Sequence, residues 1–182
     1  LFLPFDIYKP KQVKKSIDKF IPKGVKLINE EIDRIDKESD LVILKNKDII
    51  NYDILIIATG TNIAPQEIEG MLGDHWYDTV FDFYTYEGAK NLRDKLRTWE
   101  GGKLVVHITE MPIKCPVAPL EFAFLADSYF KNKGMREQVD ITFVTPMSGA
   151  FTKPKATEAL DYLLKQKNIK VVSDFNIERV DA

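Results

Sequence analysis

The stretch "GKLVVHITEMPIKCPVAPLEFAF", residues 102–124, contains the features that decide the fold of this chain. Apolar residues at 103–108 predict a short strand, and the apolar run from about 117 predicts a helix that continues to about 133. A strand, a loop and a helix form the first part of a βαβ unit, whose second strand lies parallel to the first. The loop holds the single cysteine of the chain, Cys115, between a lysine and a proline.

Composition and charge indicate an ordinary globular protein. The chain has 182 residues, of which 45% are hydrophobic, with 26 basic and 28 acidic residues and a net charge of −2. This balance argues against a basic face that binds nucleic acid. One cysteine cannot form an internal disulfide, and we expect a cytoplasmic or peripheral membrane location. The longest apolar run, residues 54–58, is too short to span a bilayer.

The second half of the chain alternates predicted helices and strands. In chain order they cover residues 86–99 (helix), 103–108 (strand), 117–133 (helix), 140–145 (strand), 154–168 (helix), 169–172 (strand) and 175–180 (strand). The first helix places Leu92 and Leu96 on one face. This alternation predicts an α/β fold with parallel strands joined by helical crossovers.

The first half is predicted to contain one helix and several strands. The helix covers residues 9–20, with Val13, Ile17 and Phe20 on one face. Strands are expected at residues 25–29, 31–36, 40–46 (the hairpin partner of the two before it) and 52–60. The last is fully apolar and ends at a glycine, which is typical of a buried position in a sheet. A seam between two domains is expected near residues 75–85.

The segment Tyr-Asp-Ile-Leu-Ile-Ile-Ala-Thr-Gly, residues 52–60, resembles the second flavin-contacting signature of flavoproteins with two dinucleotide-binding domains. The resemblance implies that Ala58, Thr59 and Gly60 pack near FAD. A glycine suits that place because it lets the backbone approach a ligand closely. The alternative is a buried strand followed by an ordinary turn.

The loop before the helix at 117–133 departs from a nucleotide-binding sequence. A dinucleotide-binding βαβ unit has G-x-G-x-x-G there, so that the backbone and the helix N-terminus can hold a diphosphate. Counting back from Glu121, the glycine positions fall on Lys114, Pro116 and Pro119. Proline has no N–H to donate and adds bulk. The next strand ends "FVTP", without an acid for a ribose hydroxyl. We therefore expect a nucleotide fold whose nucleotide site is lost.

Residues 114–122, Lys-Cys-Pro-Val-Ala-Pro-Leu-Glu-Phe, resemble the Lys-Cys-Pro-x-Ala-Pro-x-Glu segment of sulfide:quinone oxidoreductases and flavocytochrome c sulfide dehydrogenases. These are FAD enzymes of the pyridine nucleotide-disulfide oxidoreductase superfamily. The resemblance implies a Rossmann-like fold in which residues 1–80 are part of an FAD-binding domain and residues 81–182 form a degenerate NAD(P)-binding-like domain. It also implies an oxidoreductase that oxidises sulfide through a redox cysteine and passes electrons through FAD to quinone.

The same resemblance implies that several parts of the enzyme lie outside these 182 residues. They are the first FAD-binding βαβ unit, a second redox cysteine and membrane-associating helices. The chain opens on "LFLPFDIYKP", without an initial methionine, which also indicates a piece of a longer protein. We therefore expect this piece to be inactive and to bind FAD weakly or not at all. Peripheral membrane association is expected to depend on the segments outside it. A homo-oligomer is compatible with this interpretation.

Two residues are the candidate catalytic groups. Cys115 is the expected redox thiol, because a helix N-terminus and Lys114 both favour the reactive thiolate. The alternative for a lone free cysteine is an inert buried filler. Glu121 is the only charge between Pro116 and Ala126. The resemblance gives it a role in proton transfer near the cysteine, and apolar neighbours would suit that role. The alternative is a favourable charge at the start of a helix.

The remaining candidates are less specific. His75 and His107 have no Cys, Asp or Glu at ligand spacing, so no metal site is expected, and His107 is expected to be a satisfied core side chain. A run of aromatic residues has two interpretations: it borders a quinone or a membrane surface, or it packs in the core at the domain junction. We favour core packing. Its members are Trp76, Tyr77, Phe81, Phe83 and Tyr84.

Two other functions stay open at this point. A type II NADH dehydrogenase-like flavoenzyme shares the expected architecture but requires NADH binding, which the missing glycines oppose. A flavin-free binding or persulfide-carrying module would use the same fold without catalysis. Many sulfide:quinone oxidoreductases have a further cysteine in the region that matches residues 75–90, and several have a histidine after the strand that ends "FVTP". This chain lacks both, which leaves the electron acceptor open.

Overall fold

The computed structural model describes residues 1–181 and divides the chain into two units. Unit 1 combines Leu1–Val13 with Asn62–Ala182, and unit 2 is Lys14–Thr61. These units are defined by their internal contacts. The expected division into an FAD-binding part at 1–80 and an NAD(P)-binding-like part at 81–182 concerns the whole protein and remains a prediction.

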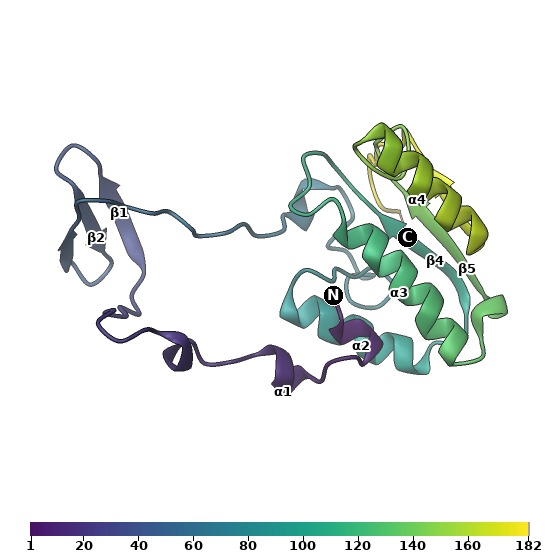
Figure 1. Ribbon diagram of the computed structural model, residues 1–182, viewed down its shortest axis with the longest axis horizontal. Helices are drawn as coiled ribbons and strands as arrows, with labels where there is room; N and C mark the ends of the chain where they lie inside the picture. The colour runs from purple at the N-terminus through teal and green to yellow at the C-terminus, as the bar shows by residue number, and fades with distance from the viewer. Residues whose placement is uncertain (182) are drawn as a thin grey trace. The chain divides into compact units, whose positions relative to one another are not determined.

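Unit 1 is built on a parallel sheet with the strand order β4-β5-β6. Its strands are β4 (Gly102–His107), β5 (Val139–Val144) and β6 (Ile169–Val172). Helices α3 (Ala118–Asn132) and α4 (Pro154–Gln166) make the two crossovers that parallel pairing requires. Helix α3 contacts β4 and β5, and α4 contacts β6; both lie in front of the sheet in Figure 1. The predicted α/β fold with helical crossovers is confirmed.

The core of unit 1 lies between this sheet and its helices. Strand β5 alternates buried and more exposed residues and contributes Ile141 and Phe143, whereas α3 contributes Phe130, whose side chain is fully buried. Helix α2 (Tyr86–Thr98) buries Leu92 and Leu96 as its spacing predicts. The expected strand at 175–180 is wrong, since Glu69 and Arg179 form only an isolated bridge there. The short 3₁₀ helices of this unit are η1 (Leu3–Phe5), η3 (Pro65–Glu67) and η4 (Arg136–Gln138).

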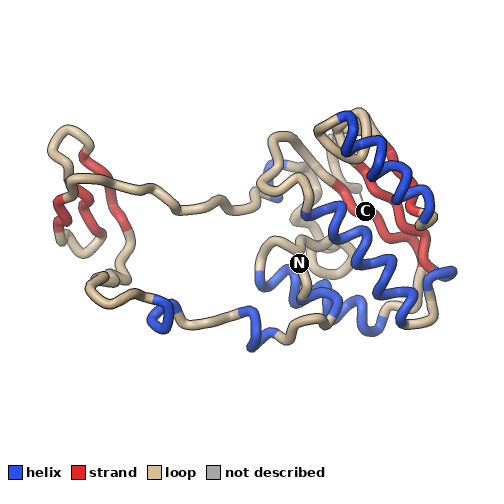
Figure 2. The backbone as a smooth tube through the Cα atoms, in the orientation of Figure 1, coloured by secondary structure: helices blue, strands red, loops and turns tan. Residues whose placement is uncertain are grey.

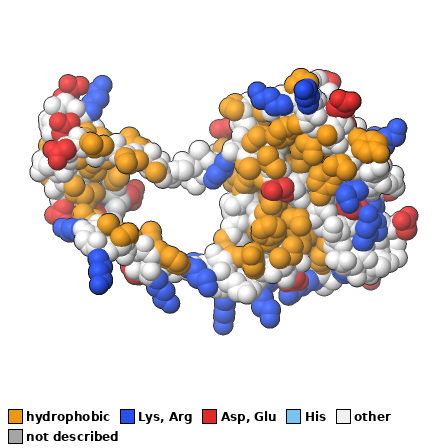
Figure 3. Space-filling model, viewed as in Figure 1, with side chains coloured by type: hydrophobic (Ala, Val, Ile, Leu, Met, Phe, Trp, Pro, Cys, Tyr) orange, Lys and Arg blue, Asp and Glu red, His pale blue; other side chains and the backbone are white. Residues whose placement is uncertain are grey.

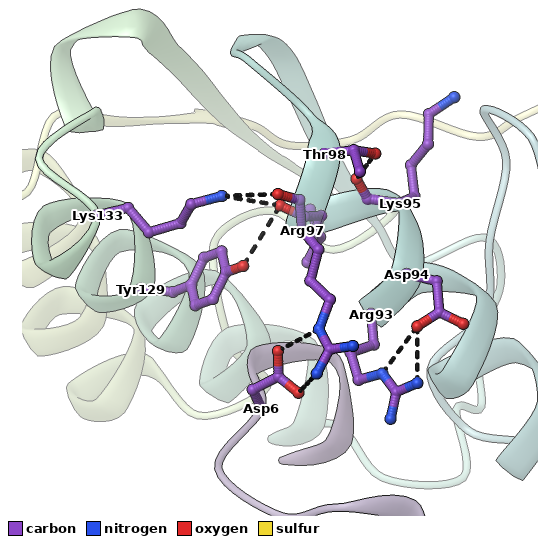
Figure 4. A network of polar contacts seen from close by, with 9 residues as sticks. Asp6, Arg93, Asp94, Lys95, Arg97, Thr98, Tyr129 and Lys133 are labelled. Carbon is purple, nitrogen blue, oxygen red and sulfur yellow. Dashed lines mark hydrogen bonds and ion pairs between the residues drawn. The ribbon is translucent and has the colours of Figure 1, made fainter.

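Polar contacts fix the N-terminal segment and α3 to α2 (Figure 4). The carboxylate of Asp6 accepts two hydrogen bonds of 2.7 Å from the Arg97 guanidinium. The last carbonyls of α2 have no partner within their own helix. The Tyr129 hydroxyl and the Lys133 ammonium of the α3 region donate to the Leu96 carbonyl at 3.3 and 3.1 Å. These contacts hold α2 against α3, the helix that follows Cys115.

A buried carboxylate joins the ends of α3 and α4. Asp127 has no exposed surface and accepts hydrogen bonds from Arg136 at 2.8 Å, Lys131 at 2.9 Å and Lys167 at 3.0 Å. The Arg136 guanidinium also donates to the carbonyls of Val139, Lys167 and Asn168. Burial of Asp127 opposes its ionisation, but these hydrogen bonds outweigh it and hold the pKa below its usual value.

Unit 2 contains an antiparallel sheet of three strands: β1 (Ile32–Asp36), β2 (Leu41–Leu44) and β3 (Ile49–Asn51). The hairpin expected from residues 31–36 and 40–46 is confirmed. Strand β3 was not predicted as a separate strand, and the strand expected at 25–29 does not form. Val42 and Leu44 of β2 are the buried side chains at the centre of this sheet.

The single helix expected at residues 9–20 is wrong. The structure has α1 (Pro10–Val13) in unit 1 and the 3₁₀ helix η2 (Ile17–Phe20) in unit 2. Val13, Ile17 and Phe20 are all exposed, so the predicted apolar face is not buried. A helix of about 12 residues is marginal in water without such burial, which explains the break.

The buried strand expected at 52–60 is also wrong. No strand covers these residues, and Figure 2 shows helix and strand elsewhere but loop here. Ile54 and Ile56 are each 83% exposed, and hydrophobic side chains at the surface of the molecule are orange in Figure 3. A strand needs a neighbouring strand for its N–H and C=O groups, and none of the strands among residues 1–181 pairs with this segment.

Within residues 1–181, no helix combines the length and the apolar character needed to cross a bilayer.

The first prediction concerns the buried carboxylate. Asp127→Ala leaves the Arg136 guanidinium without its carboxylate in a buried site, and we expect a loss of about 3–5 kcal/mol in the free energy of unfolding. Urea titration of the chain followed by circular dichroism measures it. The control is Asp78→Ala, which removes an exposed ion pair with Lys95 and should leave the free energy of unfolding nearly unchanged. Equal losses in the two variants would contradict the assignment.

The second prediction follows from the lowered pKa of Asp127. A group whose pKa is lower in the folded state stabilises the fold above its ordinary pKa of 3.8, and that contribution is lost as the pH falls through the folded value. We expect the stability advantage of the wild type over Asp127→Asn to be constant near neutral pH and to shrink below pH 3.8. Unfolding curves at several pH values measure it, and an advantage that grows in acid would refute this account.

Candidate functional site

The candidate site is the loop between β4 and α3 in unit 1. The amide of Ile108 donates to the Val144 carbonyl at 2.9 Å, so the chain leaves the sheet at the carboxyl ends of the parallel strands. In open α/β sheets, ligands bind at this edge. Cys115 lies three residues before α3 and is exposed. Its exposure does not fit the alternative of an inert buried filler.

The backbone of Cys115 is held from two directions. Its carbonyl oxygen accepts the Ala118 N–H at 3.3 Å and the Tyr84 hydroxyl at 3.4 Å. In addition, the following Pro116 restricts Cys115 to extended backbone conformations. No side chain caps the N-terminus of α3. The Cys115 carbonyl accepts the first N–H of the helix in its place. A backbone fixed in this way also fixes the direction in which the thiol leaves the loop.

The same loop does not fit a dinucleotide. A diphosphate at a helix N-terminus needs free backbone N–H groups. Here the N–H of Ala118 is already donated to Cys115, and Pro119 in the first turn of α3 has none. Val144, Thr145 and Pro146 end and follow the next strand without a carboxylate. The residues present therefore oppose the NADH binding that a type II NADH dehydrogenase-like enzyme needs.

Glu121 is the fourth residue of α3, at the same end of the helix as Cys115. Its side chain is exposed, so the apolar enclosure expected for a proton-transfer carboxylate is absent among the described residues. No hydrogen bond joins Glu121 to Cys115 within residues 1–181. The structure places the two residues on one loop-to-helix junction, and the proton role of Glu121 remains a proposal.

Ala58, Thr59 and Gly60 lie in unit 2 and are exposed. Gly60 has φ +72°, a conformation that favours glycine, and a Cβ placed there would meet no atom within 4 Å. This open turn fits the close approach of a ligand such as FAD, but the described residues supply only this part of a flavin site. The expected approach of the turn to Cys115 remains a proposal.

The aromatic run packs together and onto the core of unit 1. Phe83 stacks on Phe122 of α3 with ring centroids 4.7 Å apart, and on Tyr84 at 4.8 Å. Trp76 stacks on Tyr77 at 4.8 Å. Phe81 and Phe83 contact the core, which agrees with the favoured interpretation of core packing. Tyr84 differs, because its ring is at the surface and its hydroxyl reaches the Cys115 loop.

The environment of Tyr84 keeps its hydroxyl protonated. Partial burial is the main cause, and the charge of a Cys115 thiolate adds to it; together they raise the pKa of Tyr84 to about 12. A hollow of about 490 Å³ opens beside this ring, lined in part by Phe2, Phe83 and Tyr84. A larger hollow of about 740 Å³ lies over β5, β6 and α4, and its lining does not include Cys115.

The histidines do not form a metal site. Among residues 1–181, no three His, Cys, Asp or Glu side chains come together to hold a metal ion. The expectation that His107 is a satisfied core side chain is wrong: its Nε2 atom is buried and has no hydrogen-bond partner in the described part of the chain. Its ring packs edge-on against Phe175 at 5.5 Å, and burial lowers the pKa of the imidazole.

The association of Tyr84 with Cys115 was not predicted from the sequence. The two residues are 31 positions apart, and the contact is made to the backbone of Cys115. The available signal was indirect, namely the position of Tyr84 immediately before Thr85, a residue type that favours the N-cap of a helix. Thr85 is indeed the N-cap of α2, and its side chain accepts a hydrogen bond from Gly88.

The chain is similar in sequence to known proteins over most of its length. No family model matches the chain. The mitochondrial sulfide:quinone oxidoreductase of Dictyostelium discoideum is 24% identical to it over 164 residues, which cover 90% of this chain and 36% of that protein. The sulfide-quinone reductase of Aquifex aeolicus is 27% identical over 168 residues, which cover 88% of this chain and 38% of that protein.

The fold has a counterpart among solved structures. The structure of the Aquifex aeolicus sulfide:quinone oxidoreductase matches 98% of this chain and 42% of its own with a TM-score of 0.74 and 22% identity. The chain thus spans about two fifths of the proteins it matches. The predicted resemblance is confirmed: this chain is similar to sulfide:quinone oxidoreductases over most of its length, and its α/β fold matches part of the Aquifex aeolicus structure.

Proposed function

We propose that the whole protein is an FAD-dependent oxidoreductase that oxidises sulfide through Cys115 and delivers the electrons to quinone. One observation carries the proposal. In a chain similar to sulfide:quinone oxidoreductases, the loop at the carboxyl edge of the sheet presents an exposed cysteine where a nucleotide-binding protein would hold a diphosphate.

Cys115 provides one of the two sulfur atoms of the redox pair in this proposal. The family resemblance supplies a second cysteine that pairs with Cys115. Hydrosulfide attacks the Cys115 sulfur of the disulfide. The S–S bond to the second cysteine breaks as an S–S bond to Cys115 forms, and the electron pair of the broken bond remains on the thiolate of the second cysteine.

The other residues orient the reaction and handle protons. Glu121 accepts the proton released by hydrogen sulfide, because an exposed carboxylate at the same helix end exchanges protons with both solvent and loop. The turn Ala58-Thr59-Gly60 offers backbone for close contact with FAD, since glycine at position 60 leaves the approach open. When bound, FAD supplies the two-electron acceptor that passes electrons from the thiolate to quinone.

Quinone as the acceptor implies work at a membrane surface, because quinones dissolve in lipid. We infer peripheral association of the whole protein with a membrane. The rival NADH-dependent function is disfavoured by Pro119 and by the use of the Ala118 N–H inside the loop.

The third prediction tests the role of Cys115. In the whole protein, Cys115→Ser removes the sulfur that hydrosulfide attacks, and we expect sulfide-dependent quinone reduction to fall by more than about 10²-fold. The visible absorption of the flavin should be unchanged, because the serine keeps the backbone contacts of the loop. Stopped-flow absorbance after mixing with sulfide measures the reduction.

The matched control is Ser128→Ala, which changes a hydroxyl on the exposed side of the same helix. It should retain full activity. Full sulfide-dependent activity in Cys115→Ser would exclude the proposed role, and a wild-type protein without flavin absorption would exclude the proposed function as a whole.

A further inference from the structure

The segment before α2 forms a support for the Cys115 loop. Asp82 accepts hydrogen bonds from the Thr85 N–H at 2.6 Å, the Thr85 hydroxyl at 3.0 Å and the Tyr77 hydroxyl at 3.0 Å. Thr85 in turn caps α2 by accepting the Gly88 N–H at 2.9 Å. Tyr84 lies inside this bonded turn, so its backbone position is fixed by the start of a helix.

Aromatic stacking fixes the Tyr84 ring on the other side. The ring lies against Phe83 with an interplanar angle of 22°, and Phe83 lies against Phe122 with an angle of 15°. Phe122 is in the first turns of α3 and is buried. Stacked rings at these distances stabilise their arrangement beyond simple burial. The stack therefore links Tyr84 to the helix that begins after Cys115.

The hydroxyl of Tyr84 then reaches the loop itself. It donates to the Cys115 carbonyl at 3.4 Å, beside the Ala118 N–H that donates to the same oxygen at 3.3 Å. The contact bridges 31 residues and comes from a side chain that the sequence motif does not include. A tyrosine with a pKa of about 12 stays a hydrogen-bond donor at every pH at which the protein would work.

We propose that Tyr84 is a positioning residue for Cys115: its phenol holds the carbonyl of Cys115 and thereby fixes the direction of the thiol. This inference deepens the proposed function and rests on it only for the identity of the reaction. Tyr84 acts through the backbone of the loop, where its hydroxyl donates to the Cys115 carbonyl.

The experiment uses the single cysteine of the chain. A nitroxide spin label attached to Cys115 reports the motion of this loop alone, and its electron paramagnetic resonance spectrum separates immobilised from mobile populations. Tyr84→Phe keeps the ring stack and removes only the donor, so we expect the ratio of mobile to immobilised label to rise about fivefold, as loss of one hydrogen bond predicts. Circular dichroism and the thermal unfolding midpoint should remain close to those of the wild type.

The matched control is Tyr162→Phe on α4, which removes the hydroxyl of an exposed tyrosine that accepts a hydrogen bond from Gln166. Its label spectrum should match that of the wild type. An unchanged spectrum in Tyr84→Phe, or an equal change in both variants, would overturn the proposal.

A second measurement links position to chemistry. In the whole protein, Tyr84→Phe should lower the maximal rate of sulfide-driven reduction about fivefold and leave the KM for quinone unchanged, because the lost hydrogen bond orients the thiol and does not bind quinone. An unchanged rate would overturn the role of Tyr84. The two failures can be told apart. If the proposed function is wrong, sulfide does not reduce the wild-type protein. The label spectrum does not involve sulfide, so it still tests the contact between Tyr84 and the loop.

Discussion

The parallel pairing of β4 with β5 is the constraint on which the site depends. It extends over six residue pairs, from Gly102 opposite Val139 to His107 opposite Val144. Parallel strands cannot be joined by a tight turn, so the chain must leave β4 at its carboxyl end and return through α3. The loop that begins this crossover therefore lies where α/β proteins bind ligands. Reactive side chains in this loop therefore lie at the carboxyl edge of the sheet.

This chain presents an exposed cysteine at that position, where a nucleotide-binding protein would hold a diphosphate. A diphosphate site needs glycine for close approach and free N–H groups at the start of the helix. Pro119 removes one donor, and the Ala118 N–H is donated inside the loop to Cys115. The hydrogen bond from Ala118, together with that from Tyr84, holds the carbonyl of Cys115. Such contacts suit a reacting group, because its reacting atom must be held in a narrow range of directions.

The sequence predicted what local spacing determines and missed what distant contacts determine. Apolar periodicity located α2, α3 and α4 and the three parallel strands, and the motif located Cys115 in an exposed loop. The exposure of residues 52–60 was not predictable, because an apolar run looks the same whether or not a neighbouring strand covers it. The contact from Tyr84 and the charge cluster around Asp127 were missed for a related reason: both join residues that are far apart in the chain.

The central claim, that the crossover loop has exchanged a nucleotide for a reactive thiol, is tested most directly by treating the whole protein with sulfide and then with NADH. The account predicts that the peptide containing Cys115 gains the mass of one sulfur atom after sulfide, as measured by mass spectrometry without reductant, and that NADH does not bind. An unmodified Cys115 peptide together with saturable NADH binding would contradict it.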